Sequence, residues 1–192
     1  PIEMNTTWPE VEAKLNASTE YQEMFKTAFD IDVIDSTHVS KAIAQFIRTL
    51  ISGNSKFDKW FNQQALQLNP QELRGFTLYN GEGADCFHCH GLGGLGTDNQ
   101  CRNNGMDTEF SADYGRYDVT GNEVDKGKFR APTLRNVEVT APYMHDGRFF
   151  TLEEVVEHYS EHVTQSATID PLMELVGDGG AQLTASEKED LI

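Results

Sequence analysis

The segment Cys86-Phe87-His88-Cys89-His90 constrains this chain of 192 residues more than any other. Two cysteines three positions apart lie on the same face of a helical turn, and a histidine follows the second one directly. In a chain with three cysteines and six histidines, this order is expected by chance only on the order of 10⁻³ times. It is the attachment signature of c-type haem, in which each thiol adds to one vinyl group and the histidine binds the iron. We therefore predict that Cys86, Cys89 and His90 hold a haem covalently, with His90 as the proximal ligand.

Paired cysteines at this spacing also occur in redox-active disulfides and in zinc sites. A thioredoxin-like pair requires a preceding strand in a βαβ context, and the sequence shows neither. A zinc site would use Cys86, Cys89, Cys101 and a histidine. We favour haem over both alternatives, which leaves Cys101 as a partly buried free thiol.

The composition narrows the class of protein. The chain has 31 acidic and 15 basic residues, which gives a formal net charge of −16. Nucleic-acid binding needs a basic footprint, and anionic membrane surfaces repel such a chain, so the charge argues against both kinds of partner. No apolar run reaches the roughly 18 residues of a membrane span. Three cysteines cannot all pair with one another, which excludes a disulfide scaffold.

Hydrophobic periodicity and capping residues predict helices along the N-terminal third and at four places beyond it. The expected helices cover residues 9–17, 20–29, 38–51, 70–79 and 132–136, and two more begin after residues 151 and 184. The expected N-caps of the first three are Thr7, Ser18, and Ser36 or Thr37. Capping boxes mark three of the later starts: Asn69 with Glu72, Thr151 with Glu154, and Thr184 with Glu187. Only eight residues follow Thr184, so we expect an amphipathic helix that lacks its second half.

Residues 81–130 have a different character from the helical segments. They contain most of the glycines, many Asp and Asn residues and little periodicity, which is typical of long loops. A loop region of this length in a compact domain usually has a function. The sequence therefore predicts an all-α, cytochrome c-like haem domain whose long loops wrap around the covalently bound haem.

A six-coordinate haem needs a second axial ligand, and methionine, tyrosine and histidine are the candidates. Met144 lies in a predicted loop, where it is either a thioether ligand or a side chain that fills a gap. On the helix after Thr151, Tyr159 shares the apolar face, and core packing is its alternative role. His158 and His162 share another face, for which solvent exposure is the simpler interpretation.

Several segments resemble the C-terminal haem domain of bacterial dihaem cytochrome c peroxidases. The related enzymes that mature a tryptophan-derived quinone cofactor share the same pattern. The segments that carry the resemblance are residues 54–58, 113–116, 129–136, 140–147 and 151–156, together with the haem motif. They are long and specific, and the resemblance covers nearly the whole chain.

The resemblance implies a particular domain organisation. Proteins of this family carry two c-type haems, one in each half, and the single motif here matches the electron-transfer haem of the C-terminal half. We therefore expect residues 1–60 to be a helical segment that bridges from an N-terminal haem domain absent from this chain. Residues 61–192 would be the C-terminal haem domain, truncated at its last helix. Glu3 matches the family's acid–base glutamate beside the peroxidatic haem, where a carboxylate shuttles protons.

The resemblance also bears on the distal ligand. In the peroxidases, a methionine fourteen residues after the histidine of a Tyr-x-His stretch binds the second haem. Counted from His145, that position is Tyr159, which departs from the peroxidases and matches the quinone-maturing branch. We therefore expect Tyr159 to be the axial ligand, with Met144 as the alternative. A hard oxygen donor favours ferric iron and lowers the reduction potential relative to a thioether.

Two further sites follow from the resemblance. The family binds a calcium ion through backbone carbonyls, and Thr140 and Pro142 match those positions. Arg130 and Arg135 are candidates to pair with haem propionates through charge-assisted hydrogen bonds, and surface salt bridges are the alternative.

The function implied is that of a periplasmic dihaem peroxidase. The full enzyme would take electrons from a small redox protein, either a c-type cytochrome or a copper protein, and reduce hydrogen peroxide, whereas this fragment alone would be inactive. Two alternatives stay open: haem-dependent oxidation of a protein substrate, and a monohaem electron carrier without catalysis. The charge of −16 would steer a basic donor protein, and a homodimer is one assembly to consider.

Overall fold

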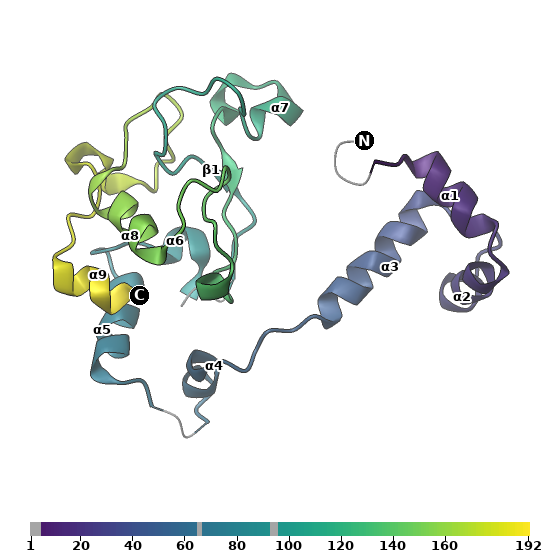
Figure 1. The fold of residues 1–192 in the computed structure, drawn as a ribbon, viewed down its shortest axis with the longest axis horizontal. Coiled ribbons are helices and arrows are strands. Elements are labelled where there is room, and N and C mark those ends of the chain that lie inside the picture. The colour runs from purple at the N-terminus through teal and green to yellow at the C-terminus, as the bar shows by residue number, and fades with distance from the viewer. Residues whose placement is uncertain (1–4, 65–66, 93–95) are drawn as a thin grey trace. The chain divides into compact units, whose positions relative to one another are not determined.

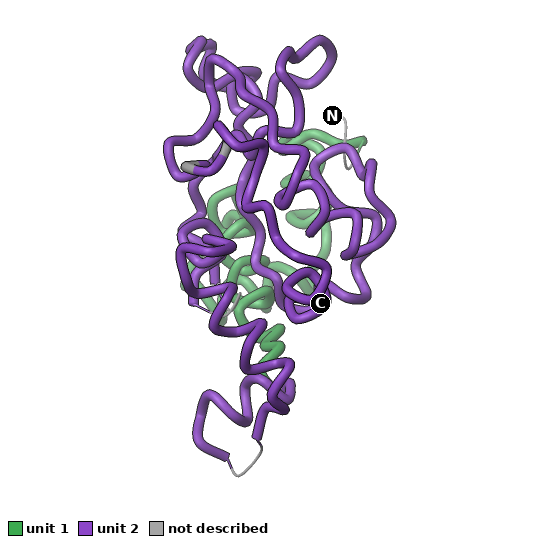
Figure 2. Tube along the Cα trace, turned by 90° about the vertical axis from the view of Figure 1, so that its left-hand side faces the viewer, with its two compact units in different colours: residues 1–53 green, residues 54–192 purple. Residues whose placement is uncertain are grey.

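The computed structural model describes residues 5–64, 67–92 and 96–192 (Figure 1). The chain divides into two compact units, residues 1–53 and residues 54–192 (Figure 2). The expected boundary lay at residues 60 and 61, and the observed division precedes it by one short helix. That helix belongs with the second unit because its residue Asp58 is bonded to Arg135.

The described residues of the first unit, 5–53, form three helices packed around a small core. They are α1 (Trp8–Asn16), α2 (Thr19–Phe29) and α3 (Ser36–Thr49). Phe25, Ile34 and Val39 are its buried apolar residues. The Asn16 side chain fixes the loop before α3, because it donates to the Ile34 oxygen at 2.7 Å and accepts from the Ile34 nitrogen at 2.9 Å. The core thus holds the predicted helices together at the N-terminal end of α3.

The start of α3 differs from the predicted one. Asp35 is the N-cap, because its carboxylate accepts from the His38 nitrogen at 2.9 Å, so the predicted caps Ser36 and Thr37 are wrong. The C-terminal half of α3 extends beyond the core, and Phe46 and Ile47 are each more than half exposed.

The second unit has six helices, three short 3₁₀ turns and one small ladder among the described residues. These elements are α4 (Lys56–Phe61), α5 (Pro70–Tyr79), α6 (Phe87–His90), β1 (Cys101–Arg102), α7 (Tyr117–Thr120), η2 (Glu123–Asp125), β2 (Phe129–Arg130), η3 (Val137–Val139), α8 (Leu152–Glu161), η4 (Glu174–Asp178) and α9 (Ala185–Leu191). Strands β1 and β2 pair antiparallel, with Cys101 opposite Arg130. The mostly helical fold confirms the predicted class, and the two-residue ladder adds to it.

The predicted helix at residues 132–136 is wrong. This stretch is irregular, and the 3₁₀ turn η3 begins only after Asn136. Asn136 has φ of 61°, in the left-handed region, which interrupts a right-handed helix. Residues 131–134 have no regular secondary structure, and the backbone oxygen of Pro132 lies 2.8 Å from His90 Nδ1 rather than in a helical hydrogen bond.

The capping boxes predicted for α5, α8 and α9 are present. Asn69 accepts from the Glu72 nitrogen at 2.9 Å, and the Asn69 nitrogen donates back to Glu72 at 2.6 Å. Thr151 and Thr184 begin their helices in the same reciprocal way. These local signals fix where the helices start before any tertiary contact is considered.

Helix α9 packs tightly against α5 (Figure 1). Gly75 permits the approach, because a Cβ atom there would lie 1.8 Å from the Asp190 oxygen. Arg74 makes a two-pronged ion pair with the Asp190 carboxylate at 2.7 Å for both contacts. On its other side, Lys188 of α9 donates to Glu157 of α8 at 2.8 Å, so α9 links α5 to α8.

No helix in the described part of the chain is both long enough and apolar enough to cross a lipid bilayer.

Candidate haem site

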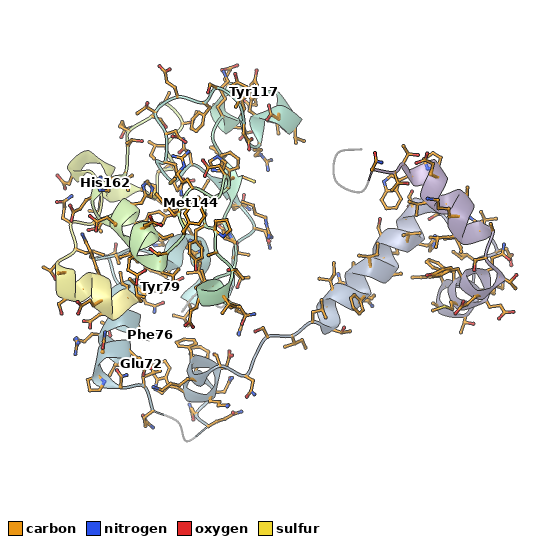
Figure 3. The ribbon with its side chains drawn as sticks, in the orientation of Figure 1. Glu72, Phe76, Tyr79, Tyr117, Met144 and His162 are labelled. Atoms are coloured by element: carbon orange, nitrogen blue, oxygen red, sulfur yellow. The ribbon has the colours of Figure 1, made fainter. Side chains whose placement is uncertain are left out.

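The second unit contains a cavity of about 430 Å³ that brings together the predicted haem ligands. Cys89 and His90 line it from α6, and Cys86 lines it from the N-cap position directly before that helix. Tyr159 lines it from α8, and Met144 lines it from the loop before α8. Figure 3 shows Met144 in the middle of this unit, beside α8. Much of the remaining wall is apolar, and it includes Leu134, Val137, Leu152, Val155, Val163 and Leu172. Two thiols, an imidazole and an apolar wall are the groups that a covalently bound porphyrin requires, so the residues fit a haem.

Helix α6 places the two thiols and the imidazole within one turn. The His90 nitrogen donates to the Cys86 oxygen at 3.1 Å, which closes the turn. Gly91 ends it with φ of 67°, a conformation that glycine adopts at no steric cost. Both sulfurs are therefore presented to the cavity from the same helical turn, Cys86 as its N-cap and Cys89 within α6.

The ring of His90 is held in one orientation by Pro132. Its Nδ1 atom lies 2.8 Å from the Pro132 backbone oxygen, which can only accept a hydrogen bond. Nδ1 therefore carries the proton, and Nε2 keeps a lone pair free for a metal. Burial lowers the pKa of His90 below its ordinary value, which favours the neutral imidazole that a ligand must be.

The two thiols are protonated at neutral pH. Burial raises the pKa of Cys86 to about 12 and that of Cys89 to about 11. They are therefore poor disulfide-exchange nucleophiles, and this argues against the thioredoxin-like alternative. The described residues contain no cluster of three or more histidine, cysteine or acidic side chains placed to hold a metal ion, and such a cluster is what the zinc alternative would require.

Both candidate distal ligands converge on Asn104. Its Nδ2 atom lies 3.0 Å from the Tyr159 hydroxyl oxygen and 3.7 Å from the Met144 sulfur. Burial raises the pKa of Tyr159 to about 12, and the hydrogen bond from Asn104 opposes that rise. No sequence pattern marks Asn104 as a site residue, since its Asn-Asn-Gly context is typical of an ordinary loop.

His158 of α8 and His162, the residue that caps its C-terminus, do not line the cavity. His158 is 3% exposed, and its Nε2 atom lies 3.3 Å from the Asn104 backbone oxygen. The His162 side chain is 65% exposed and lies 3.8 Å from Glu157. The described wall of the cavity includes neither ring.

Three comparisons identify relatives of the chain. The family model for di-haem cytochrome c peroxidase matches residues 1–66. The cytochrome c551 peroxidase of Nitrosomonas europaea is 41% identical over 160 residues, which are 82% of this chain and 47% of that protein. The methylamine utilization protein MauG of Methylorubrum extorquens is 33% identical over 160 residues, which are 83% of this chain and 45% of that protein. The crystal structure of a MauG-like protein associated with microbial copper homeostasis is 36% identical, and the TM-score is 0.78 over 100% of this chain and 62% of that one.

This chain belongs to the dihaem cytochrome c peroxidase family. It spans about half the length of the curated relatives that it matches. Within that family, the cavity residues have the identities that a c-type haem site needs.

The family's propionate and calcium positions stay predictions. Arg130 lines the cavity, and its Nη1 atom donates to Asn99 at 2.9 Å. Arg135 instead makes a two-pronged ion pair with Asp58, at 2.9 and 3.1 Å. Thr140 and Pro142 both line the cavity, and their peptide groups are the expected calcium ligands.

A third arginine, which the sequence analysis did not consider, also lines the cavity. Arg102 pairs with Asp98 and, at 3.2 Å, with Asp170. Its Nε atom is buried and has no hydrogen-bond partner among the described residues. The proposed acid–base residue Glu3 lies outside the described residues.

Proposed function

We propose that residues 54–192 are a cytochrome c-like domain that carries one haem c in the cavity, surrounded by the long loops. The observation that carries the proposal is that Cys86, Cys89, His90 and Tyr159 line the same cavity. Cys86 and Cys89 would hold the haem through thioether bonds, and His90 Nε2 would be the proximal ligand. When bound, the haem supplies one-electron chemistry between ferric and ferrous iron.

Side chains and backbone groups of this chain would orient the iron ligands and surround the haem. The Pro132 oxygen holds the proton on His90 Nδ1, which leaves the lone pair of Nε2 free to bind iron. The apolar wall excludes water, which strengthens electrostatic interactions inside the cavity. Tyr159 would supply the second ligand, with Met144 as the alternative, and its oxygen would favour ferric iron.

The domain would serve a longer dihaem peroxidase in the periplasm. It would accept electrons one at a time from a c-type cytochrome or copper protein and pass them to a second haem in the other half of the protein. There, two electrons and two protons would reduce one hydrogen peroxide to two waters, and Glu3 would move protons. The support is the peroxidase relative at 41% identity, and the net charge of −16 would steer a basic donor. We also propose that the backbone oxygens of Thr140 and Pro142 bind calcium and that the protein assembles as a homodimer.

A second candidate is the oxidation of a protein substrate. The observation that favours it is the tyrosine at position 159, where the resemblance expects methionine in the peroxidases. The chain's similarity to MauG proteins, at 33% identity, points the same way. Steady-state turnover of peroxide with a reduced cytochrome, measured on the full-length protein, separates the two, because a protein-oxidising enzyme would turn over slowly in that assay.

Haem attachment is tested by pyridine spectra of the denatured protein. We expect a covalent c-type haem that is lost when Cys86 and Cys89 are both changed to alanine. Cys101→Ala is the matched control, since it removes the remaining cysteine and should retain the haem. Denatured protein without covalent haem would refute the proposal.

A further inference from the structure

We propose that Asn104 is a positioning residue that determines whether Tyr159 or Met144 occupies the distal side of the iron. The inference rests on the proposed haem binding. Its basis is geometric: one carboxamide nitrogen lies 3.0 Å from the tyrosine oxygen and 3.7 Å from the methionine sulfur. A carboxamide has two N–H groups, so it can donate to both atoms at once.

The loop that carries Asn104 is fixed by its neighbours on both sides. Asn103 is 1% exposed, and its Nδ2 atom donates to Ser166 and Thr168, each at 3.0 Å. The Gly105 oxygen accepts from the Thr164 nitrogen at 2.9 Å. The Asn104 carboxamide therefore projects from a backbone that is anchored independently of its side chain.

The same loop is also tied to the helix that carries Tyr159. The Asn104 backbone oxygen lies 3.3 Å from His158 Nε2, one residue before Tyr159. Gly105 permits the close approach, because its φ is 71° and a Cβ atom there would lie 2.5 Å from Val163 Cγ1. Side chain and main chain of Asn104 thus meet adjacent positions of α8, which fixes the distance between the carboxamide and the tyrosine oxygen.

The chemical consequence follows from what each ligand prefers. An oxygen ligand favours ferric iron, and a thioether favours ferrous iron. An N–H donor stabilises negative charge on the tyrosine oxygen, so it favours the deprotonated form that binds iron, and it also engages the methionine sulfur, which restrains the competing ligand. Without the donor, the balance should shift toward sulfur and the reduction potential should rise.

The test uses the haem-loaded protein and two substitutions of similar shape. Asn104→Leu removes all polarity, and Asn104→Asp keeps the shape but removes the donor. Loss of a hydrogen bond to a charged oxygen should change the ferric-to-ferrous equilibrium about tenfold to hundredfold, which corresponds to about 60 to 120 mV for a one-electron couple. We expect the Leu variant to raise the midpoint potential by that amount and to gain the near-infrared charge-transfer band of methionine-ligated ferric haem.

Two controls separate positioning from general destabilisation. Asn80→Leu removes another half-buried carboxamide, which donates to the Phe76 oxygen at 2.8 Å outside the cavity, and it should leave the potential unchanged. In the double variant Asn104→Leu with Met144→Leu, the methionine band should disappear again.

The outcomes distinguish this inference from the proposed function. Suppose that Tyr159→Phe changes the spectrum and the potential but Asn104→Leu and Asn104→Asp do not. The role of Asn104 is then refuted, and the assignment of Tyr159 as the distal ligand is supported. If Tyr159→Phe changes neither the spectrum nor the potential, the assignment of Tyr159 as the distal ligand and the role of Asn104 are both refuted.

Discussion

Asp58 and Arg135 form a two-pronged ion pair that joins helix α4 to the loop after β2. The Nη2–Oδ1 distance is 2.9 Å and the Nη1–Oδ2 distance is 3.1 Å, and Asp58 is 4% exposed. Ser55 adds hydrogen bonds to the same carboxylate, from its nitrogen at 2.9 Å and its hydroxyl at 2.8 Å. The pair therefore links two segments that are far apart in sequence, one of which contains the Pro132 oxygen that orients His90.

Replacing Asp58 with asparagine should destabilise the second unit by about 1 to 3 kcal/mol, because the charge of Arg135 loses its buried partner. Urea unfolding of the haem-loaded protein measures this change. The control is Lys26→Gln, which breaks exposed contacts to Asp30 and Asp32 and should have little effect. Equal stability of the Asp58 variant and the native protein would contradict the prediction.

The same pair predicts a dependence of stability on pH. The hydrogen bonds from Arg135, followed by those from Ser55, lower the pKa of Asp58 well below its ordinary value of about 3.9. The folded state then binds fewer protons than the unfolded state, so the contribution is complete above about pH 4 and is lost as the pH falls toward the folded pKa. The difference in unfolding free energy between native protein and Asp58→Asn should be constant from about pH 5 to 7 and shrink below about pH 4. A difference that grows on acidification would oppose this assignment.

The contact between α5 and α9 predicts the effect of a single methyl group. A Cβ atom on residue 75 would lie 1.8 Å from the Asp190 oxygen, which belongs to the backbone and cannot rotate away. We expect Gly75→Ala to displace α9 and cost about 1 to 3 kcal/mol, despite the higher helix propensity of alanine. Thermal unfolding measures the loss. Gly177→Ala is the control, since no atom lies within 4 Å of its added Cβ, and a similar loss there would argue against the steric explanation.

Features encoded by neighbouring residues could be predicted from the sequence. Each capping box lies within four consecutive residues, so Asn69, Thr151 and Thr184 mark their helices without tertiary information. The N-cap of α3 was missed because Asp35, Ser36 and Thr37 are adjacent and all can cap. Sequence pattern alone does not decide between such neighbours.

Contacts between distant segments could not be predicted from the sequence. Asn104 and Tyr159 are 55 positions apart, and Asp58 and Arg135 are 77 positions apart. The packing of loops brings these pairs together, and no periodicity in the sequence predicts which loops pack against each other. The left-handed conformation of Asn136, which ends the expected helix at 132–136, is equally a property of the folded loop.

The distal ligand gives the last prediction. Tyr159→Phe removes the proposed oxygen ligand and keeps the ring, so the reduction potential of the haem-loaded protein should rise. We expect the midpoint potential to rise by on the order of 100 mV, within the roughly 0.8 V that axial ligands span, with a changed ferric absorption spectrum. Potentiometric titration followed by absorption measures both.

The matched control for this change is Tyr143→Phe. Tyr143 also lines the cavity, but its hydroxyl donates to the Val137 oxygen at 2.9 Å. Removing this hydroxyl should therefore leave the absorption spectrum the same as that of the native protein. Met144 lies near the vacated position and can become the ligand once the competing tyrosine oxygen is gone, because its sulfur lies 3.7 Å from the Asn104 Nδ2 atom that contacts Tyr159. Combining Tyr159→Phe with Met144→Leu should then produce a five-coordinate, high-spin iron. A low-spin spectrum that survives in the double variant would show that the second ligand is neither of these side chains.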